Sequence, residues 1–252
     1  MMQDNERLIT LVKEIYDKKF QNAKVIFLAG SLIRGEGTKY SDLDLVVVFE
    51  KLKHAYRESF FYKKYPVEAF VHDPETLKFF FKEIDAKSGK PFLPYMVLEG
   101  LEIPQSSNFS RKLKRLAAFT IKAGPPKWTN KDVNSARYHI TDLVDDIRNP
   151  RSAAELTASG AELYRVLADF FFRAQCKWSC NNKYIPRLLK KIAPDIYKQF
   201  LQAFDYLFIK KSPAKVIKLT EKILTPYGGF YFAGHKLSAP TSWRKQAKNE
   251  KS

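Results

Sequence analysis

The sequence predicts an α+β protein in which a small mixed-sheet domain is followed by an all-helical bundle domain. Short apolar runs typical of strands lie in the first part of the chain, at 24–29, 43–49 and 66–72. Apolar residues at helical spacing fill the second part, near 109–123, 129–148, 151–175, 184–191, 194–209 and 213–224. The charge changes with the pattern: residues 1–104 carry 16 basic and 16 acidic side chains, and the remainder carries 28 and 11. These observations predict domains over 1–105 and 106–240, followed by a basic tail over 241–252 that we expect to be disordered.

The remaining elements follow from apolar spacing and from the residues that interrupt it. In the first domain, helices are predicted over 4–20, 74–84 and 91–99, and a short edge strand over 101–103. Asp73 directly precedes one of these helices and is a candidate N-cap. The segment His54–Tyr65 fits a strand or a helix, and the choice stays open. In the second domain, Asn149-Pro150 separates two long helices, because proline cannot continue a helix.

The most informative stretch runs from Val25 to Phe49. An apolar strand ends at Gly30-Ser31, and a polar connection containing two glycines leads to Asp42-Leu43-Asp44 at the head of the next apolar run. Successive side chains of an extended strand alternate between its faces, so the two aspartates point the same way. Neighbouring carboxylates repel each other unless a cation lies between them. Magnesium prefers one or two carboxylates together with substrate phosphates, so this pattern predicts a magnesium site.

The Gly30-Ser31 pair adds a candidate phosphate site next to these carboxylates. A glycine directly after a strand lets the backbone come close to a ligand. If a helix begins near Ser31, its free amides favour phosphate, and the serine hydroxyl adds a donor. Phosphate donors beside metal-binding carboxylates are what nucleotidyl transfer requires, because that chemistry depends mainly on positioning and charge neutralisation.

This arrangement resembles the nucleotidyltransferase superfamily of DNA polymerase beta. The resemblance rests on Gly30-Ser31, a gap of ten residues, and an Asp-x-Asp flanked by apolar residues. It is most similar to the bacterial antibiotic nucleotidyltransferases of the kanamycin and streptomycin/spectinomycin types. The specific part covers Val25 to about Val71, and the rest of the chain resembles those enzymes in layout alone. The resemblance implies magnesium-dependent transfer of AMP from ATP to a hydroxyl, with release of pyrophosphate.

The site residues follow from the motif and the resemblance together. Asp42 and Asp44 are the expected metal ligands. Gly30, Ser31 and Ser41 are expected to hold the triphosphate, and Arg34 either neutralises it or braces the loop.

A third carboxylate is expected on a neighbouring strand. Glu68 is the only acid in the apolar run from Tyr65 to His72. Beside the two aspartates it would serve as a metal ligand or as the general base for the attacking hydroxyl. In the streptomycin-type enzymes the matching strand glutamate is the base, whereas in the kanamycin-type enzyme the base comes from the helical domain. Three acids at helical spacing could supply that alternative base here or bind a cationic substrate, although a solvated face is also consistent: Asp142, Asp145 and Asp146.

The helical domain contributes two further candidates. In streptomycin-type enzymes a segment with a tryptophan, a loop and a lysine follows the long helix, and the lysine reaches the ATP phosphates. Trp178 and Lys183, with Arg187 one turn on, resemble that segment. Tyr227 and Tyr231 could stack on a base or serve only in packing.

The acceptor remains open at the level of sequence. The net charge is +17, which disfavours a polycationic aminoglycoside and is compatible with a weakly charged, antibiotic-like small molecule or with an RNA end. A catalytically inactive nucleotide-binding or toxin–antitoxin module is a further alternative.

No apolar run reaches the roughly 20 residues needed to span a bilayer, and the first residues do not resemble a signal peptide. The two cysteines, Cys176 and Cys180, are expected to be free thiols. Free thiols are typical of a reducing compartment, so the sequence predicts a cytoplasmic protein.

Overall fold

The computed structural model describes the backbone of residues 2–243 and the side chains of residues 6–243. The chain divides into two compact units. The first contains Met1–Lys127 together with Gln175–Asn181, and the second contains Trp128–Ala174 together with Asn182–Ser252. The predicted basic tail, 241–252, lies outside the described residues from position 244 onward.

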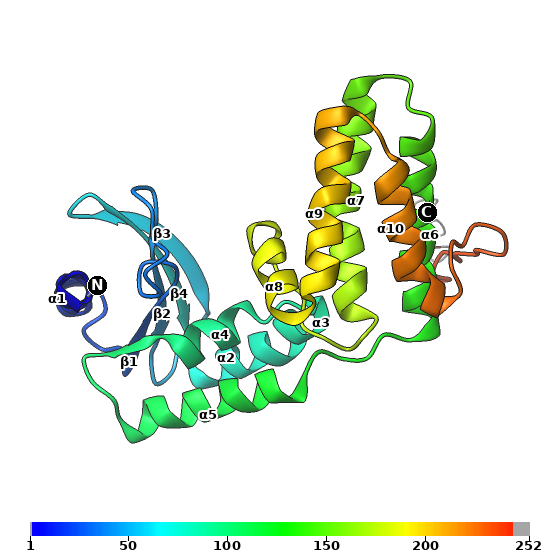
Figure 1. The fold of residues 1–252 in the computed structure, drawn as a ribbon. Coiled ribbons are helices and arrows are strands. Elements are labelled where there is room, and N and C mark those ends of the chain that lie inside the picture. Colours follow the sequence, from blue (N-terminus) through cyan, green and yellow to red (C-terminus); the bar gives the residue numbers. More distant parts are fainter. Residues whose placement is uncertain (1, 244–252) are drawn as a thin grey trace, which may run out of the picture. The chain divides into compact units, whose positions relative to one another are not determined.

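The first unit is built around a mixed five-stranded sheet (Figure 1). Its strands are β1 (Val25–Ala29), β2 (Leu43–Val48), β3 (Tyr56–Tyr62), β4 (Tyr65–His72) and β5 (Leu101–Ile103). They lie in the order β3-β4-β2-β1-β5. The central pair, β2 and β4, is parallel, and the other neighbours are antiparallel. Together with the helical second unit, this sheet confirms the predicted α+β fold.

The segment that the sequence left open, His54–Tyr65, contains strand β3. Exposure alternates along part of this strand, as expected where one face of an edge strand meets the protein. β3 turns directly into β4 through Lys63 and Lys64, whose φ angles are 44° and 71°. Two successive residues with positive φ are typical of the two-residue turns that match the twist of a hairpin. Lysine is uncommon at such positions, so no turn signature marked this hairpin in the sequence.

Each face of the sheet is covered by helices (Figure 1). On one face, α1 (Met2–Lys19) packs Leu8, Val12 and Ile15 against strand residues that include Leu45 and Val47. On the opposite face, apolar residues of three helical segments form a second core: α2 (Pro74–Phe79), α4 (Phe92–Glu99) and α5 (Asn108–Ala123). Burying both faces explains why the central strands are almost continuously apolar.

The helix predicted over 74–84 begins at its predicted cap and runs further than expected. Asp73 accepts a hydrogen bond from the backbone amide of Thr76, completing a capping box. After α2 the chain passes through the π-helical turn η1 (Phe80–Asp85) into α3 (Ala86–Ser88). The helical segment ends at Gly89, whose φ of 73° lies in the left-handed region that glycine adopts without strain.

Two buried ionisable groups in this part of the chain have shifted pKa values. Burial raises the pKa of Asp85 to about 6, although its carboxylate accepts a hydrogen bond from the Leu93 amide. Burial lowers the pKa of His72 to about 4. The stability contributed by Asp85 is therefore present below its ordinary pKa of 3.8 and lost as the pH rises through about 6. The contribution of His72 has the opposite sign: it is present above pH 6.5 and lost as the pH falls through about 4.

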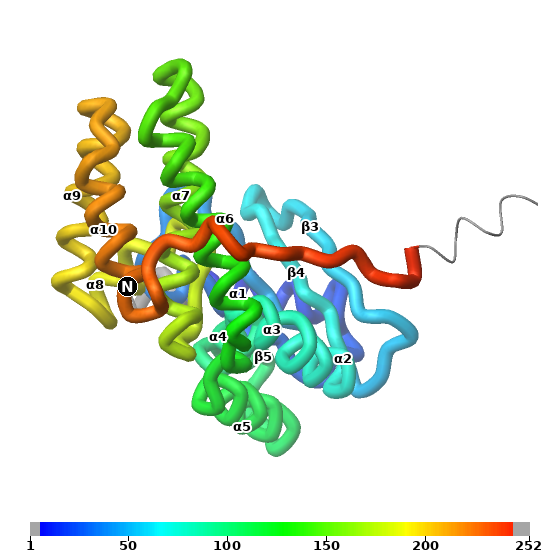
Figure 2. The backbone as a smooth tube through the Cα atoms, turned by 90° about the vertical axis from the view of Figure 1, so that its right-hand side faces the viewer, coloured from blue at the N-terminus to red at the C-terminus, as the bar shows by residue number. Residues whose placement is uncertain are grey.

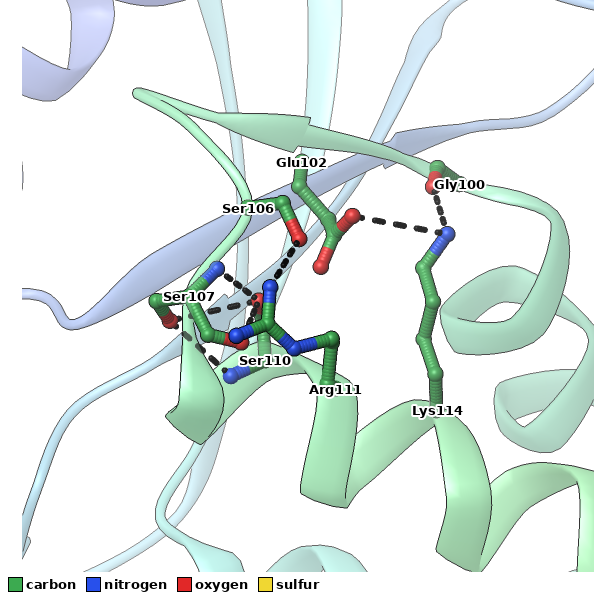
Figure 3. Close-up of polar contacts among 7 residues, drawn as sticks. All are labelled: Gly100, Glu102, Ser106, Ser107, Ser110, Arg111 and Lys114. Carbon is green, nitrogen blue, oxygen red and sulfur yellow. Dashed lines mark hydrogen bonds and ion pairs between the residues drawn. The ribbon is translucent and has the colours of Figure 1, made fainter.

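Helix α5 belongs to the first unit, whereas its basic composition predicted that it lies in the second domain. Ser107 caps this helix through a capping box with Ser110. Lys114 donates a hydrogen bond to the Gly100 carbonyl at 2.8 Å and lies 4.0 Å from the Glu102 carboxylate (Figure 3). These contacts join α5 to the end of α4 and to β5. The boundary between the two units therefore lies near Lys127, whereas the net charge of the sequence changes near residue 105.

All regular elements in the described part of the second unit are helices, as the sequence predicted. Its long helices run side by side (Figure 1): α6 (Asn130–Arg148), α7 (Ala153–Arg173), α9 (Pro194–Lys210) and α10 (Ala214–Leu224). The 3₁₀ turn η2 (Asn182–Tyr184) leads into the shorter α8 (Ile185–Ile192), and η3 (Thr225–Tyr227) follows α10. Beyond η3 the chain crosses α6 without forming a helix (Figure 2). Arg137 of α6 fixes this crossing by donating to the carbonyls of Gly228 and Gly229 at 2.6 and 2.8 Å.

Among the described residues, none of the helices is both long enough and apolar enough to cross a lipid bilayer.

Candidate active site

Sheet register brings the three predicted carboxylates to one place. In the parallel pair of β2 and β4, Asp44 lies directly opposite Glu68. On the other side, Ala29 at the end of β1 lies opposite Asp44. Asp42 precedes Asp44 by two residues, so both aspartates point to the same face of the sheet.

Asp42, Asp44 and Glu68 form a cluster that we call the acidic trio. Each residue offers one carboxylate oxygen, and these three oxygens lie within 4.8 Å of one another. All three side chains are partly buried, so their mutual repulsion is less screened than it would be on an open surface. Hard cations such as magnesium take oxygen ligands and would offset this repulsion. The donor set therefore fits the divalent metal that the sequence implied.

Gly30 lies directly against the trio. Its φ is 86°, and a Cβ atom placed on it would lie 2.0 Å from Oδ2 of Asp44. The sequence explained this glycine by the approach of a ligand to the backbone. The structure shows an additional reason, because any side chain at this position would push the Asp44 carboxylate away. Its role in holding a phosphate stays a prediction.

The connection between β1 and β2 forms turns, not the helix that the sequence allowed at Ser31. The Glu36 amide donates to the Ser31 carbonyl at 2.9 Å, and Gly35 has a φ of 71°, so the chain turns away before a helix can form. The Ser31 hydroxyl donates to Oγ of Ser41 at 3.2 Å. Oγ of Ser41 also accepts from the Thr38 amide at 2.8 Å. These bonds hold both candidate phosphate-binding serines in one loop next to the trio.

Arg34 braces this loop. Its guanidinium lies 3.3 Å from the Glu36 carboxylate and 3.7 Å from that of Glu99 at the end of α4. Of the two roles that the sequence left open for Arg34, these contacts support bracing. Neutralisation of a bound phosphate stays a prediction.

Comparison with known proteins agrees with this geometry. Residues 9–94 match the family model described as "Nucleotidyltransferase domain". Residues 9–94 form a nucleotidyltransferase domain. The matched range contains the whole acidic trio, Gly30 and the loop that follows it, so the trio is the candidate catalytic site of this domain.

Two further comparisons add little. Among solved structures, the chain is similar to the crystal structure of a nucleotidyltransferase-like protein from Exiguobacterium sibiricum 255-15. The two are 12% identical, the match covers 85% of this chain and 80% of that chain, and the TM-score is 0.41. A likeness this distant carries no argument here. The search of curated proteins found no match.

The nucleotidyltransferase domain contains one site residue that the sequence did not suggest. Arg57 on β3 forms an ion pair with Oε1 of Glu68. Its guanidinium also lies over the ring of Phe70, 4.9 Å from the ring centre. Once β3 is known to be a strand beside β4, alternation places Arg57 on the face that carries Glu68. Because the sequence left the secondary structure of residues 54–65 open, the position of Arg57 beside Glu68 could not be inferred from it.

The other candidate residues lie in the second unit, except Trp178, which belongs to the first unit. Lys183 is exposed, with its ammonium 5.3 Å from the ring centre of Tyr184, and its role toward nucleotide stays a prediction. The acids of α6 are exposed as well. Asp145 forms an ion pair with Arg148 at 2.9 Å, and Asp146 accepts from Ser159 at 3.4 Å. These contacts are consistent with a solvated helix face.

The two candidate stacking tyrosines make packing contacts. Tyr227 meets Phe170 edge to face, with ring centres 5.3 Å apart. The Tyr231 ring lies under the guanidinium of Arg137 at 5.1 Å. Both contacts favour the packing role among the alternatives that the sequence left open.

The Gly30→Ala substitution tests the close approach to Asp44. Left-handed φ in an alanine costs about 1 kcal/mol or more, and the new methyl group would displace the carboxylate. A displacement of about 1 Å can cost roughly a hundredfold in rate, so we expect a loss of at least that order. Mn²⁺ affinity, measured by electron paramagnetic resonance, should fall as well.

Gly229→Ala provides a matched control. Gly229 has a φ of 71°, but a Cβ atom added to it would have no atom within 4 Å apart from those of its chain neighbours. Both variants carry the cost of left-handed φ in an alanine, whereas Gly30→Ala alone should lose Mn²⁺ affinity. Equal Mn²⁺ affinities in the wild type and Gly30→Ala would contradict this account of the glycine.

Proposed function

We propose that this protein is a magnesium-dependent nucleotidyltransferase that moves AMP from ATP to a hydroxyl of a small-molecule acceptor and releases pyrophosphate. The observation that carries the proposal is the meeting of Asp42, Asp44 and Glu68 within 4.8 Å inside a nucleotidyltransferase domain. Adenylyl as the transferred group and an antibiotic-like acceptor rest on the resemblance to the antibiotic enzymes.

Each residue has a defined task in this proposal. Asp42 and Asp44 would hold the magnesium, which would neutralise phosphate charge and align the reacting groups. Ser31, Ser41 and the backbone at Gly30 hold the triphosphate. Arg34 keeps the loop in place through its contacts with Glu36 and Glu99.

The reaction is a single displacement at phosphorus. The acceptor hydroxyl oxygen forms a bond to the α-phosphorus of ATP while the bond from that phosphorus to the bridging oxygen breaks. Glu68 takes the hydroxyl proton, and pyrophosphate leaves with the electron pair of the broken bond. A general base acts over hydrogen-bonding distance, and Glu68 lies within the trio as this role requires.

A second candidate acceptor, an RNA end, is favoured by the surface of α5. This helix is in the same unit as the trio and carries no acidic residue. Its exposed residues include Arg111, Lys112, Arg115 and Lys122. Phe119 lies between Arg115 and Lys122 in the sequence, is 73% exposed and could stack on a base. An extended basic face of this kind attracts a polyanion, whereas binding of a compact, weakly charged acceptor does not require it.

Labelling with nucleoside triphosphates that carry the label at the α-phosphate separates these candidates. We expect transfer to a small hydroxyl compound, with ATP preferred and with one pyrophosphate released for each label transferred. Labelling of RNA instead would replace the small-molecule acceptor by the alternative. Binding of nucleotide without transfer to any acceptor of either class would favour the non-catalytic module.

Salt dependence provides an independent prediction for the acceptor. Binding of RNA through α5 would displace counterions, so the logarithm of affinity would fall with the logarithm of salt concentration with a slope of several units. The double substitution Lys112→Glu, Arg115→Glu should then flatten the slope. A small neutral acceptor should bind almost equally at about 50 and 200 mM salt. Tight, steeply salt-dependent RNA binding together with RNA labelling would contradict the small-molecule proposal.

A further inference from the structure

Arg57 is not part of the motif that predicted the acidic trio. It lies on β3, where Arg57 is opposite Phe70 and Ser59 is opposite Glu68 of β4. Side chains two residues apart share a face of a strand, so Arg57 reaches along the surface of β4 to Glu68. The Phe70 ring supports its guanidinium from below, at 4.9 Å from the ring centre. This support directs the positive charge into the acidic trio.

The charge of Arg57 has two opposite effects on the trio. It reduces the repulsion among Asp42, Asp44 and Glu68, and thereby stabilises the trio when no cation is bound. It also opposes the binding of a divalent cation, because like charges at this separation repel each other. In addition, the ion pair occupies Oε1 of Glu68, one of the two oxygens through which that carboxylate could act.

Arg57 is able to leave this position. Its side chain is 60% exposed, whereas that of Glu68 is only 18% exposed. An ion pair with one solvated partner contributes little free energy and exchanges readily. The planar guanidinium binds phosphate oxygens as well as carboxylate oxygens, through the same pair of parallel hydrogen bonds. A triphosphate held next to the trio would therefore offer Arg57 a second anionic partner.

We propose that Arg57 is the counter-ion of the acidic trio in the nucleotide-free protein and moves from Glu68 to the nucleotide phosphates when nucleotide binds. This proposal rests on the proposed function, because it requires a metal and a triphosphate at the trio. Arg57 then couples the two ligands: the trio binds a divalent cation weakly alone and much more tightly together with nucleotide. The same movement frees Glu68 for the acceptor hydroxyl.

Mn²⁺ binding, followed by electron paramagnetic resonance with and without a non-hydrolysable ATP analogue, tests this coupling. The Arg57→Ala variant should bind Mn²⁺ alone roughly three- to tenfold more tightly than the wild type, the range expected for a partly exposed charge. The analogue should then increase the Mn²⁺ affinity of Arg57→Ala by a smaller factor than that of the wild type. Arg57→Lys keeps the charge without the planar fork, and should lie between them.

Lys19→Ala is the matched control. Lys19 pairs with Glu58 at 3.0 Å, and Glu58 is the neighbour of Arg57 on the opposite face of β3. This variant removes a comparable ion pair from the same strand and should leave Mn²⁺ binding unchanged. Melting temperatures of all variants show whether the fold is retained.

The outcomes separate this proposal from the proposed function. If Arg57→Ala matches the wild type in Mn²⁺ affinity and in coupling, Arg57 is not the counter-ion. If it binds Mn²⁺ more weakly under both conditions, Arg57 only orients Glu68, and the proposal is equally overturned. Asp44→Asn tests the metal site itself: unchanged Mn²⁺ binding in that variant would overturn the proposed function. Loss of binding in Asp44→Asn with no effect in Arg57→Ala would overturn the Arg57 proposal alone.

Discussion

Replacing Asp44 with asparagine is expected to abolish nucleotidyl transfer while leaving the protein folded. The side chain keeps its shape and loses one negative charge from a cluster in which three carboxylate oxygens lie within 4.8 Å. Removal of that charge relieves repulsion, so the melting temperature should stay the same or rise. Metal binding, however, loses one of its two aspartates, and transfer should fall below detection. The measurement is transfer of α-labelled nucleotide to the acceptor, paired with thermal unfolding.

Asp42→Asn should behave in the same way, because Asp42 is the second ligand of the proposed metal. Asp17→Asn is the control: Asp17 is exposed on α1, and its substitution changes the net charge equally without touching the trio. Wild-type turnover in either trio variant, with any acceptor, would show that the metal assignment is wrong.

Replacing Glu68 with glutamine is expected to lower turnover by roughly a hundredfold or more, the range associated with general-base catalysis. Glutamine keeps the size of the side chain but cannot take the proton of the acceptor hydroxyl. If Glu68 is the base, nucleotide affinity should change little, and Mn²⁺ affinity should fall only by the modest factor that the loss of one neighbouring negative charge explains. A large loss of Mn²⁺ affinity would instead make Glu68 a third metal ligand. Single-turnover rates and Mn²⁺ titrations on the same preparation distinguish these two roles.

The same experiment on α6 tests the alternative base. Asp142 and Asp145 are exposed, and Asp145 already pairs with Arg148. We expect Asp142→Asn and Asp145→Asn to retain nearly full turnover. A severe loss in either variant, together with a nearly neutral Glu68→Gln, would move the base to the helical unit, as in the kanamycin-type enzymes.

The trio could be predicted from sequence because its information is local. Asp42 and Asp44 stand at the head of an apolar strand, and strand alternation alone places them on one face. Glu68 was found because it is the single acid in another apolar run. The prediction needed only the assumption that β2 and β4 are neighbours, which the parallel pairing bears out.

The features that the sequence missed depend on long-range packing or on unusual turns. The role of Arg57 was not predicted because the strand that carries it was not recognised. The hairpin turns at Lys63 and Lys64, whereas glycine or asparagine at these positions would have indicated a turn. The place of α5 was missed because net charge reports composition, whereas Leu113 and Ala117 of that helix are buried in the core beneath the sheet. The close approach of Gly30 to Asp44 depends on the pairing of β1 with β2, so the sequence motif alone could not predict it.

The central claim is that Asp42 and Asp44 hold a divalent metal together with nucleotide. Anomalous diffraction from crystals grown with Mn²⁺ and a non-hydrolysable ATP analogue tests it most directly. The account predicts an anomalous peak within coordinating distance of both aspartate carboxylates, with the analogue's phosphates completing the coordination. A bound analogue without Mn²⁺ at these carboxylates, or Mn²⁺ located elsewhere, would contradict it.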